Sequence, residues 1–343
     1  MTLTLISTGL ADHNDMSLKA QQAAQQCHKL YAEQYTTILN TTLQQLEQTT
    51  QHKITPLPRS AYEETSQQIL QEAKTHDIGI LIGGDSLTAT THISLILDAT
   101  KQGIPTRIIH GSSILTAIAE TGLSLYKFGR TVTLPLPDKA PPDTVLQTLI
   151  DNREQGLHTL ILLDLDTQNP LTADKAIQTL LDADKPEAYN KTTITVALTR
   201  LGWPDSTITA DTAENLTQHH YGPPPHTLIV PGKLHFHEEE ALQTLAGLPP
   251  KALETHNPTG EVQRLTTKYL KSCRQAIQNL KKTTPPDQLT TDNINSLIQH
   301  ATNYLDDSEY YAQEKKATAL ASVSYAEGIL DALRLLGLVD FQW

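Results

Sequence analysis

The 343-residue sequence contains only two cysteines, Cys27 and Cys273, and they lie far apart in the chain. Two cysteines are too few for a disulfide framework or for a zinc site with cysteine ligands. Apolar runs are short as well, and none approaches the roughly 18 residues of a membrane-spanning helix. The first residues lack the basic segment of a secretory signal peptide. These absences predict a cytoplasmic protein without membrane contacts.

Positive charge is also scarce. Lysine and arginine number 26 against 38 aspartates and glutamates, which gives a formal net charge of −12. Proteins that bind nucleic acids usually present a basic face, so this balance argues against a nucleic-acid partner. The chain is 38% hydrophobic and 19% charged, as in globular proteins. At about 100–200 residues per domain, the length predicts two or three domains.

Short apolar runs alternate with segments of helical periodicity over residues 1–255. The predicted strands are residues 3–8, 77–83, 106–110, 131–136, 158–165, 193–201 and 227–231. The predicted helices are residues 17–29, 60–74, 87–102, 113–123, 143–154 and 172–184. This alternation predicts an α/β sheet covered by helices on both faces. Ligands of such sheets bind outside the carboxyl ends of the strands, so the loops there are the candidate site.

The composition changes near residues 255–260. From Glu261 onward no segment has a strand pattern, and the apolar residues recur at helical spacing. The sequence TTPPD, residues 283–287, interrupts this pattern. The segments predicted as helices are residues 265–280, 292–305 and 308–336. We therefore expect a separate all-α module at the C-terminal end.

The stretch GGDSLTATTH, residues 83–92, follows a predicted buried strand. Gly83 and Gly84 let the backbone approach a ligand closely, and the threonines add hydroxyl groups without bulk. We expect Asp85 to be ionised, because the dipole at a helix amino terminus favours an anion. Such a carboxylate suits ribose hydroxyls or a cationic group. The alternative is that Asp85 or Ser86 only caps the following helix.

The same stretch contains GDSL, residues 84–87, which is the nucleophile motif of a family of serine esterases. A serine nucleophile needs a histidine base that is oriented by an acid. That esterase family places both as Asp-x-x-His late in the chain, and the sequence contains no Asp-x-x-His. The motif alone therefore does not support a hydrolase.

Four other segments place small or rigid residues at predicted strand ends: residues 6–12, 110–114, 160–164 and 221–226. The last contains three prolines that fix the backbone ahead of His226. Without a family for comparison, His226 is interpreted as a structural residue more readily than as a functional one.

Residues 233–240 contain two histidines, His235 and His237, followed by three glutamates. In a strand the two histidines would share one face, as metal ligands can. However, the sequence places no third ligand, and the glutamates fit the acidic first turn of a helix. We expect no metal site.

Taken together, the loops resemble those of the diphthine synthase family. This family belongs to the tetrapyrrole-methylase-like enzymes that use S-adenosylmethionine. The resemblance covers residues 1–255, and four blocks in the right order make it specific. The blocks are residues 84–85 with 89–92, 121–123 with 126–129, 156–164, and 224–235.

The resemblance implies an α/β methyltransferase of two lobes with the cofactor in the cleft between them. The lobes would be residues 1–105 and 106–255. Residues 256–343 resemble a small archaeal helical domain of uncharacterised function. This implies an archaeal source and a fused chain.

The implied cofactor is S-adenosylmethionine. The family's cofactor contacts carry over by position to eight residues of this chain: Leu10, Asp85, Thr88, Ser113, Ile114, Leu163, Leu201 and His226. Many of these contacts are made in the family by backbone groups or apolar walls. No residue is assigned as a catalytic base.

The sequence departs from the family at five of the positions around the loops. The family usually has glycine where this chain has Ser7, and proline where it has Gly83 and Ser86. It usually has an aliphatic residue at Thr88 and a small one at Leu201. The replacements at positions 7, 83 and 86 stay small, so we expect the cradle for the cofactor to persist. Leu201 is bulkier than the family residue.

The resemblance implies trimethylation of the amino group of 2-(3-amino-3-carboxypropyl)histidine in translation elongation factor 2, which gives diphthine. Elongation factor 2 would be the protein partner, and the enzyme would be a homodimer. Two alternatives remain. A methyltransferase of the same fold could act on a tetrapyrrole or on ribosomal RNA. A degenerate, non-catalytic scaffold is suggested by Ser7 and Leu201.

Overall fold

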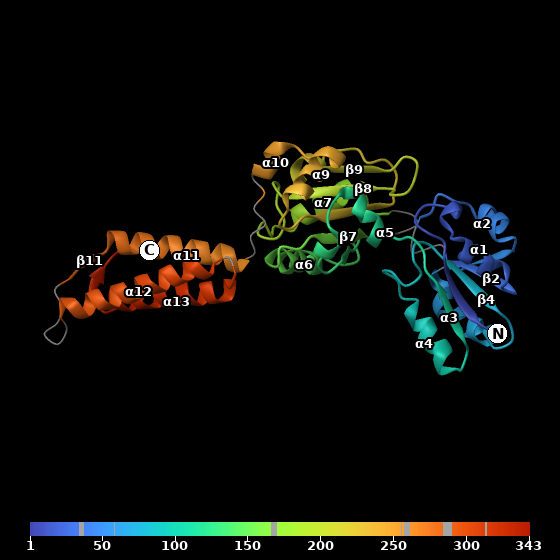
Figure 1. The fold of residues 1–343 in the computed structure, drawn as a ribbon, viewed down its shortest axis with the longest axis horizontal. Coiled ribbons are helices and arrows are strands. Elements are labelled where there is room, and N and C mark those ends of the chain that lie inside the picture. Colours follow the sequence, from blue (N-terminus) through green and yellow to red (C-terminus); the bar gives the residue numbers. More distant parts are fainter. Residues whose placement is uncertain are drawn as a thin grey trace. The chain divides into compact units, whose positions relative to one another are not determined.

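The computed structural model describes residues 1–33, 38–57, 59–165, 170–254, 256, 261–283, 290–312 and 314–343, with the side chains of residues 59–65, 261 and 264 left out. Backbone contacts divide the chain into two units (Figure 1). The first comprises Met1–Leu149 and Leu157–His256, and the second comprises Ile150–Gly156 and Asn257–Trp343. Two features predicted from the sequence lie mostly outside the described residues: the composition change at residues 255–260 and the break at residues 283–287.

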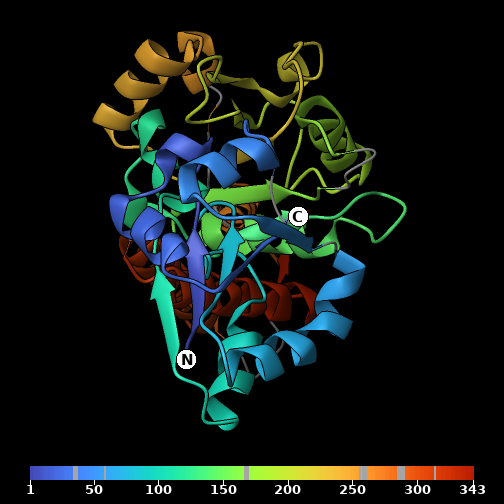
Figure 2. The same cartoon turned by 90° about the vertical axis from the view of Figure 1, so that its right-hand side faces the viewer.

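The first lobe contains a parallel five-stranded sheet in the order β3-β2-β4-β1-β5. Its strands are β1 (Leu3–Ser7), β2 (Lys29–Glu33), β3 (Ile54–Leu57), β4 (Ile78–Ile82) and β5 (Thr106–Ile109). The accompanying helices are η1 (His13–Asp15), α1 (Leu18–Gln25), α2 (Leu43–Thr50), α3 (Arg59–Ala73) and α4 (Ile93–Lys101). Figure 2 shows β1, in dark blue, between β4 and β5. Strands β1 and β4 are buried along their whole length, as expected for central strands of a parallel sheet.

The order of these strands determines where a ligand can bind. The chain leaves β1 to build β2 and β3 on one side and returns through β4 to place β5 on the other. The loops after β1, β4 and β5 therefore lie together at the carboxyl ends of these neighbouring strands, where the strand order reverses. Such a switch point is the usual ligand site of an open α/β sheet.

The second lobe contains a mixed sheet in the order β6-β7-β10-β8-β9. Strands β6 and β7 are parallel, and the other pairs are antiparallel. The strands are β6 (Val132–Leu134), β7 (Thr159–Leu163), β8 (Ile194–Thr199), β9 (Thr207–Thr212) and β10 (His226–Val230). The helices are α5 (Ile114–Ala117), η2 (Ile118–Thr121), η3 (Leu125–Lys127), α6 (Asp143–Glu154), α7 (Ala173–Asp182), α8 (Ala213–Leu216), α9 (Phe236–Ala246) and α10 (Pro250–Glu254).

A buried carboxylate, Glu238 of α9, joins three of the sequence blocks in this lobe. One oxygen accepts hydrogen bonds from Lys127 Nζ and, at 2.9 Å, from the backbone N–H of His235. The other accepts from the backbone N–H of Ser124 at 3.1 Å and from His158 Nε2 at 3.2 Å. Burial alone would raise the pKa of Glu238, but these donors outweigh it and lower the pKa to about 2.

This depressed pKa predicts a pH-dependent contribution to stability. The contribution is fully present above the ordinary glutamate pKa and is lost as pH falls toward about 2, because the unfolded chain takes up the proton first. We expect wild type to be more stable than Glu238→Gln at pH 6, and about 2 kcal/mol of that difference to disappear by pH 3. Urea unfolding at both pH values measures it. Glu240→Gln, at an exposed position of α9, is the control. A difference that does not change with pH would contradict the prediction.

The structure confirms the predicted α/β pattern, but several elements differ from the expectation. In the first unit three strands were missed: β2, β3 and β9. The helix expected at residues 17–29 ends at Gln25, because residue 29 already begins β2. The helix expected at residues 87–102 begins only at Ile93, and residues 85–92 form turns instead. Asp85 is therefore not at a helix amino terminus, and neither it nor Ser86 caps α4.

In its described residues the second unit contains the end of α6 together with α11 (Glu261–Asn279), α12 (Thr291–Tyr311) and α13 (Lys316–Leu335). The expectation of no strands after Glu261 was wrong, since β11 (Lys281–Lys282) pairs with β12 (Val339–Asp340). The helix expected from residue 308 begins at residue 316. Ser308 is buried inside α12, where its Oγ donates to the Ala319 carbonyl at 2.7 Å.

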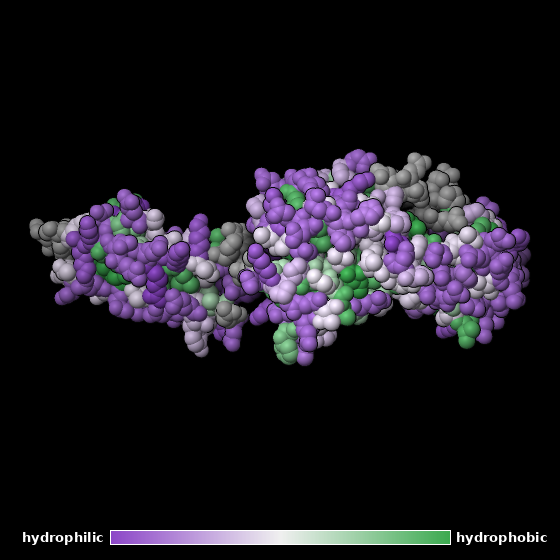
Figure 3. Space-filling model, turned by 90° about the horizontal axis from the view of Figure 1, so that it is seen from above, coloured by the Kyte–Doolittle hydropathy of each residue, from purple (hydrophilic) through white to green (hydrophobic). Residues whose placement is uncertain are grey.

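Apolar side chains of both units are collected in internal clusters. In the second unit Cys273, Leu305, Val323, Leu330 and Phe341 share one core. The face seen in Figure 3 is largely hydrophilic, with small apolar patches. Among the described residues, no helix combines the length and the apolar character that crossing a membrane requires.

Candidate functional site

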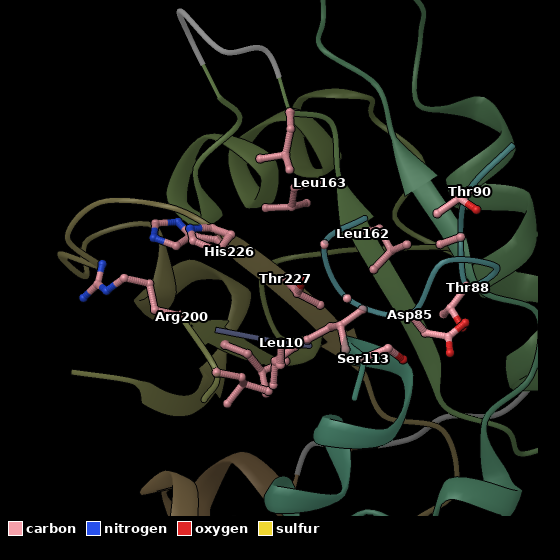
Figure 4. Close-up of a pocket in the computed structure, with 18 residues that line it drawn as sticks. Leu10, Asp85, Thr88, Thr90, Ser113, Leu162, Leu163, Arg200, His226 and Thr227 are labelled. Carbon is pink, nitrogen blue, oxygen red and sulfur yellow. The ribbon is translucent and has the colours of Figure 1, made fainter. Parts of the chain in front are cut away.

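One pocket of the first unit is lined by all eight residues predicted as cofactor contacts (Figure 4). Its empty space, including the solvent in the open mouth, is about 900 Å³. The first lobe contributes loops after β1, β4 and β5, and the second contributes residues of β7, β8 and β10 with the loops beside them. The lining residues not predicted are Gly83, Gly84, Ala89, Thr90, Leu162, Leu165, Leu198, Arg200, Pro225 and Thr227.

The loops after β1 and β4 are joined by their backbones. Gly84 N–H donates to the Gly9 carbonyl at 2.8 Å, and Gly9 N–H donates to the Gly84 carbonyl at 3.2 Å. Both glycines have left-handed φ values, +89° at Gly9 and +69° at Gly84. A Cβ at Gly9 would lie 2.3 Å from Asp15 Cβ. This position therefore requires glycine for both conformation and space.

Asp85 connects the loop after β4 to the loop after β5. Its Oδ1 accepts hydrogen bonds from Leu87 N–H at 3.0 Å and Thr88 Oγ1 at 3.2 Å. Its Oδ2 accepts from His110 Nδ1 at 2.8 Å and from Gly111 N–H at 3.2 Å. Burial raises the pKa of Asp85, but these donors outweigh burial and lower the pKa below its usual value. The predicted ionised state thus has a different cause from the helix dipole.

Four hydrogen bonds fill the approximate acceptor capacity of a carboxylate. Asp85 consequently fixes the geometry of two loops at the pocket before any ligand arrives. Figure 4 shows Asp85 and Thr88 together on one side of the pocket, with Leu10 and His226 farther across it.

His226 forms part of the opposite wall and is buried. Its Nδ1 accepts a hydrogen bond from Ala173 N–H at 3.1 Å, and its Nε2 donates to the Pro223 carbonyl at 3.1 Å. Burial lowers the pKa of His226, so the ring is neutral near pH 7. Because both nitrogens are engaged, His226 offers the pocket a ring surface and no free acid or base.

Comparison with known proteins agrees with this architecture. The family of tetrapyrrole (corrin/porphyrin) methylases matches residues 2–217. The diphthine synthase of Methanocaldococcus jannaschii is 38% identical over 252 residues, which are 71% of this chain and 98% of that protein. The diphthine synthase of Methanosarcina barkeri is 39% identical over 258 residues, 72% and 97% of the two chains. A crystal structure of diphthine synthase superposes with a TM-score of 0.70 at 33% identity, covering 75% of this chain and 100% of the other.

The chain belongs to the diphthine synthases of the tetrapyrrole methylase family.

A second family, a protein of unknown function called DUF357, matches residues 238–339. This match begins inside α9, whose Leu242 and Ala246 belong to the core of the second lobe. It continues through α11, α12 and α13 of the second unit.

Ser7 and Ser86, at two positions where the sequence departs from the diphthine synthase pattern, are hydrogen-bonded to each other. Ser86 N–H donates to Ser7 Oγ at 2.9 Å, and both residues are buried. Where the family has proline at position 86 there is no N–H to satisfy, and where it has glycine at position 7 there is no acceptor. In this chain a donor and its acceptor are present together. The serine at position 7 therefore has a partner of its own between the loops after β1 and β4.

A double-mutant cycle tests this pairing. Ser7→Gly alone is expected to lower the free energy of unfolding by about 1–3 kcal/mol, because a buried N–H loses its acceptor. Adding Ser86→Pro removes the donor, so most of the loss should be recovered. Urea unfolding measures the stability of the single and the double variants. Ser7→Ala also removes the acceptor but does not add the backbone flexibility of glycine, so it separates these two effects. If the two single losses simply add in the double variant, the pairing is wrong.

Ser86 has no geometry of a nucleophile. Its Oγ is buried and has no hydrogen-bond partner in the part of the chain that the structure describes. A serine nucleophile needs a histidine within hydrogen-bond reach. The esterase alternative therefore receives no support from the structure.

Leu201 and Arg200, after β8, are accommodated in the second lobe. The Leu201 side chain is buried in the core of that lobe, so its bulk is largely taken up there. Arg200 Nε donates to Asp205 Oδ1 at 3.0 Å, and its Nη1 donates to the Pro223 carbonyl. The same carbonyl accepts from His226, so Arg200 supports the loop that positions this histidine. Arg200 was not among the predicted site residues, although a lone arginine directly after a buried strand is visible in the sequence.

The histidines considered for a metal site lie at the start of α9. His235 is the residue before the helix, and His237 is inside it, so they do not share a strand face as considered from the sequence. Among the described residues, no group of three or more histidine, cysteine, aspartate or glutamate side chains could hold a metal ion.

Proposed function

We propose that this protein transfers methyl groups from S-adenosylmethionine to the amino group of 2-(3-amino-3-carboxypropyl)histidine in elongation factor 2, in three steps that give diphthine. The observation that carries the proposal is the convergence of all eight family contact positions on one pocket. The relatives named diphthine synthase match almost over their full length, which supports the same reaction.

The residues present fit S-adenosylmethionine. Leu10, Ile114, Leu163 and Leu201 offer apolar walls, and Asp85, Thr88 and Ser113 are the polar residues among the predicted contacts. When bound, this cofactor supplies an electrophilic methyl group. The protein has to align the acceptor nitrogen with that methyl group and keep the nitrogen unprotonated at the moment of attack. A pocket sheltered from water favours the neutral amine.

Binding of the cofactor separates an enzyme from a scaffold. Calorimetric titration with S-adenosylmethionine is expected to show one site per chain. Thr90→Trp, at a residue that lines the pocket, should abolish binding by filling the space. Thr91→Trp, at the exposed neighbouring residue, should leave binding unchanged. No binding to wild type, or equal binding to both variants, would contradict the proposed site.

The choice of acceptor separates the alternatives of the same fold. A tetrapyrrole or ribosomal RNA methyltransferase would use the same cofactor. Methyl incorporation from labelled S-adenosylmethionine should be seen with elongation factor 2 that carries the precursor, and with neither a tetrapyrrole nor ribosomal RNA. Unmodified elongation factor 2 is the matched control because it lacks only the acceptor amine.

The finer assignments follow from the same resemblance. We expect a cytoplasmic archaeal homodimer without nucleic-acid or membrane partners. We also expect three domains, predicted as residues 1–105, 106–255 and 256–343; β5 (Thr106–Ile109) belongs to the sheet of the first lobe, so the first boundary lies after residue 109. The division of backbone contacts near residue 256 supports the second boundary. Limited proteolysis should cut between the α/β lobes and the helical unit first, and light scattering of the intact protein reports the number of chains.

A further inference from the structure

Thr227 lies in the part of the pocket wall that the sheet of the second lobe provides. In β10 it pairs with Leu162 of β7 on one side and with Leu198 of β8 on the other. All three residues line the pocket, and Figure 4 shows Thr227 and Leu162 among the side chains around it. Side chains of directly paired residues lie on the same face of a sheet. The three therefore form one row across the sheet, with the threonine in the middle.

The hydroxyl of Thr227 is the polar group of this row. The residue is only 8% exposed. Within the residues that the structure describes, Thr227 Oγ1 has no hydrogen-bond partner. A hydroxyl enclosed by apolar side chains is unfavourable unless it is paired. Valine would suit a strand equally well, so the strand itself does not require this hydroxyl. A polar atom of a bound ligand can supply the partner.

The other polar side chains of the second-lobe wall are already engaged. Arg200 donates to Asp205 and to the Pro223 carbonyl. Both ring nitrogens of His226 are bonded to backbone groups. The remaining residues of this wall are apolar: Leu162, Leu163, Leu165, Leu198, Leu201 and Pro225. In the described wall of this lobe, the Thr227 hydroxyl is thus the polar side-chain group left for a ligand.

This chemistry suits one part of S-adenosylmethionine better than the others. The amino-acid end carries an ammonium and a carboxylate, and the ribose carries two hydroxyls. Each of these needs several polar or charged partners, which a wall of leucines with one hydroxyl does not provide. Adenine is planar, so apolar side chains can cover its faces, and its edge carries an amino group and ring nitrogens that single hydrogen bonds can recognise.

We propose that the Thr227 hydroxyl forms a hydrogen bond with the edge of the adenine ring and makes the pocket selective for this base; this inference rests on the proposed function. A hydroxyl can donate to a ring nitrogen or accept from the 6-amino group. Thr227 would determine the specificity for the cofactor and take no part in the transfer of the methyl group.

The first test compares Thr227→Val, which replaces the hydroxyl by a methyl group, with Thr227→Ser, which keeps it. Thr209→Val, at a threonine of β9 outside the pocket, is the matched control. By calorimetry, we expect Thr227→Val to raise the Kd for S-adenosylmethionine about 3- to 10-fold, the range for one hydrogen bond. Thr227→Ser should retain most of the affinity, and Thr209→Val should stay within about twofold of wild type.

Urea unfolding without cofactor separates a ligand contact from a structural role. Because the described chain makes no hydrogen bond to this hydroxyl, Thr227→Val should be at least as stable as wild type. A clear loss of stability would show that the hydroxyl is bonded within the protein, and this result would overturn the inference.

Analogues of S-adenosylhomocysteine identify the part of the ligand that Thr227 contacts. In each analogue the 6-amino group is replaced by hydrogen, or one ring nitrogen is replaced by CH. One of them should bind wild type more weakly than the parent compound and lose no further affinity in Thr227→Val, because the same hydrogen bond is already absent. Equal affinity of wild type and Thr227→Val for the cofactor, or no analogue with such coupling, would overturn the inference. Failure of wild type to bind S-adenosylmethionine would instead overturn the proposed function.

Discussion

Replacing Asp85 with alanine is expected to weaken S-adenosylmethionine binding by about 1.5–3 kcal/mol, which is roughly 10- to 150-fold in Kd. The carboxylate accepts four hydrogen bonds from two loops that line or flank the pocket. Its removal leaves Leu87 N–H and Gly111 N–H without their acceptor and releases His110. The free energy of unfolding should fall together with the affinity, because these bonds exist without ligand.

Two further variants sharpen this prediction. Asp85→Asn keeps the shape but turns an amide toward donors that need an acceptor, so it should also bind the cofactor more weakly. Asp98→Ala removes an exposed aspartate of α4 and should change neither quantity. Calorimetry gives Kd, and urea unfolding gives stability. Normal affinity in Asp85→Ala would show that the carboxylate does not organise the pocket.

The largest loss of stability is expected from breaking the pair between Glu33 and His92. Glu33 ends β2, and His92 ends the GGDSLTATTH stretch. Their side chains are 2.7 Å apart and each is 1% exposed. Removing one member of a buried pair of this kind typically lowers the free energy of unfolding by about 3–5 kcal/mol, because the remaining polar group is still desolvated but has lost its partner.

We therefore expect Glu33→Leu and His92→Leu each to lower the free energy of unfolding by about 3–5 kcal/mol. Replacing both with leucine removes both buried polar groups, so the double variant should be clearly more stable than the sum of the single losses implies. Urea unfolding of the four proteins gives the coupling energy. Additive losses would mean that the pair is not coupled.

The hydrophobic pattern was sufficient for the fully buried strands and for one amphipathic helix. The strands β1, β4 and β10 and the helix α6 lie where the apolar periodicity placed them. The missed strands have weaker patterns. β2 reads KLYAE and follows a helix without a clear break, whereas β3 contains Pro56 and lies at a sheet edge, where proline is tolerated.

The positions of the site residues could be predicted, because strand ends and family motifs both mark loops. The hydrogen bonds between these residues could not be predicted. Asp85 and His110 are 25 residues apart, and Ser7 and Ser86 are 79 apart. Only the parallel pairing of β1 with β4 and β5 brings such residues together. The ionised state of Asp85 was predicted from a helix directly after it. In the structure that helix begins only at Ile93, and hydrogen-bond donors from two loops lower the pKa instead.

We propose that this protein methylates the modified histidine of elongation factor 2 with the cofactor bound at the Asp85 pocket. Mass spectrometry of the peptide that carries this histidine tests it most directly, after the precursor factor has been incubated with S-adenosylmethionine and the protein. We expect successive addition of three methyl groups by wild type and far slower addition by Thr90→Trp. An unmethylated peptide with wild type, or equal methylation by Thr90→Trp, would contradict it.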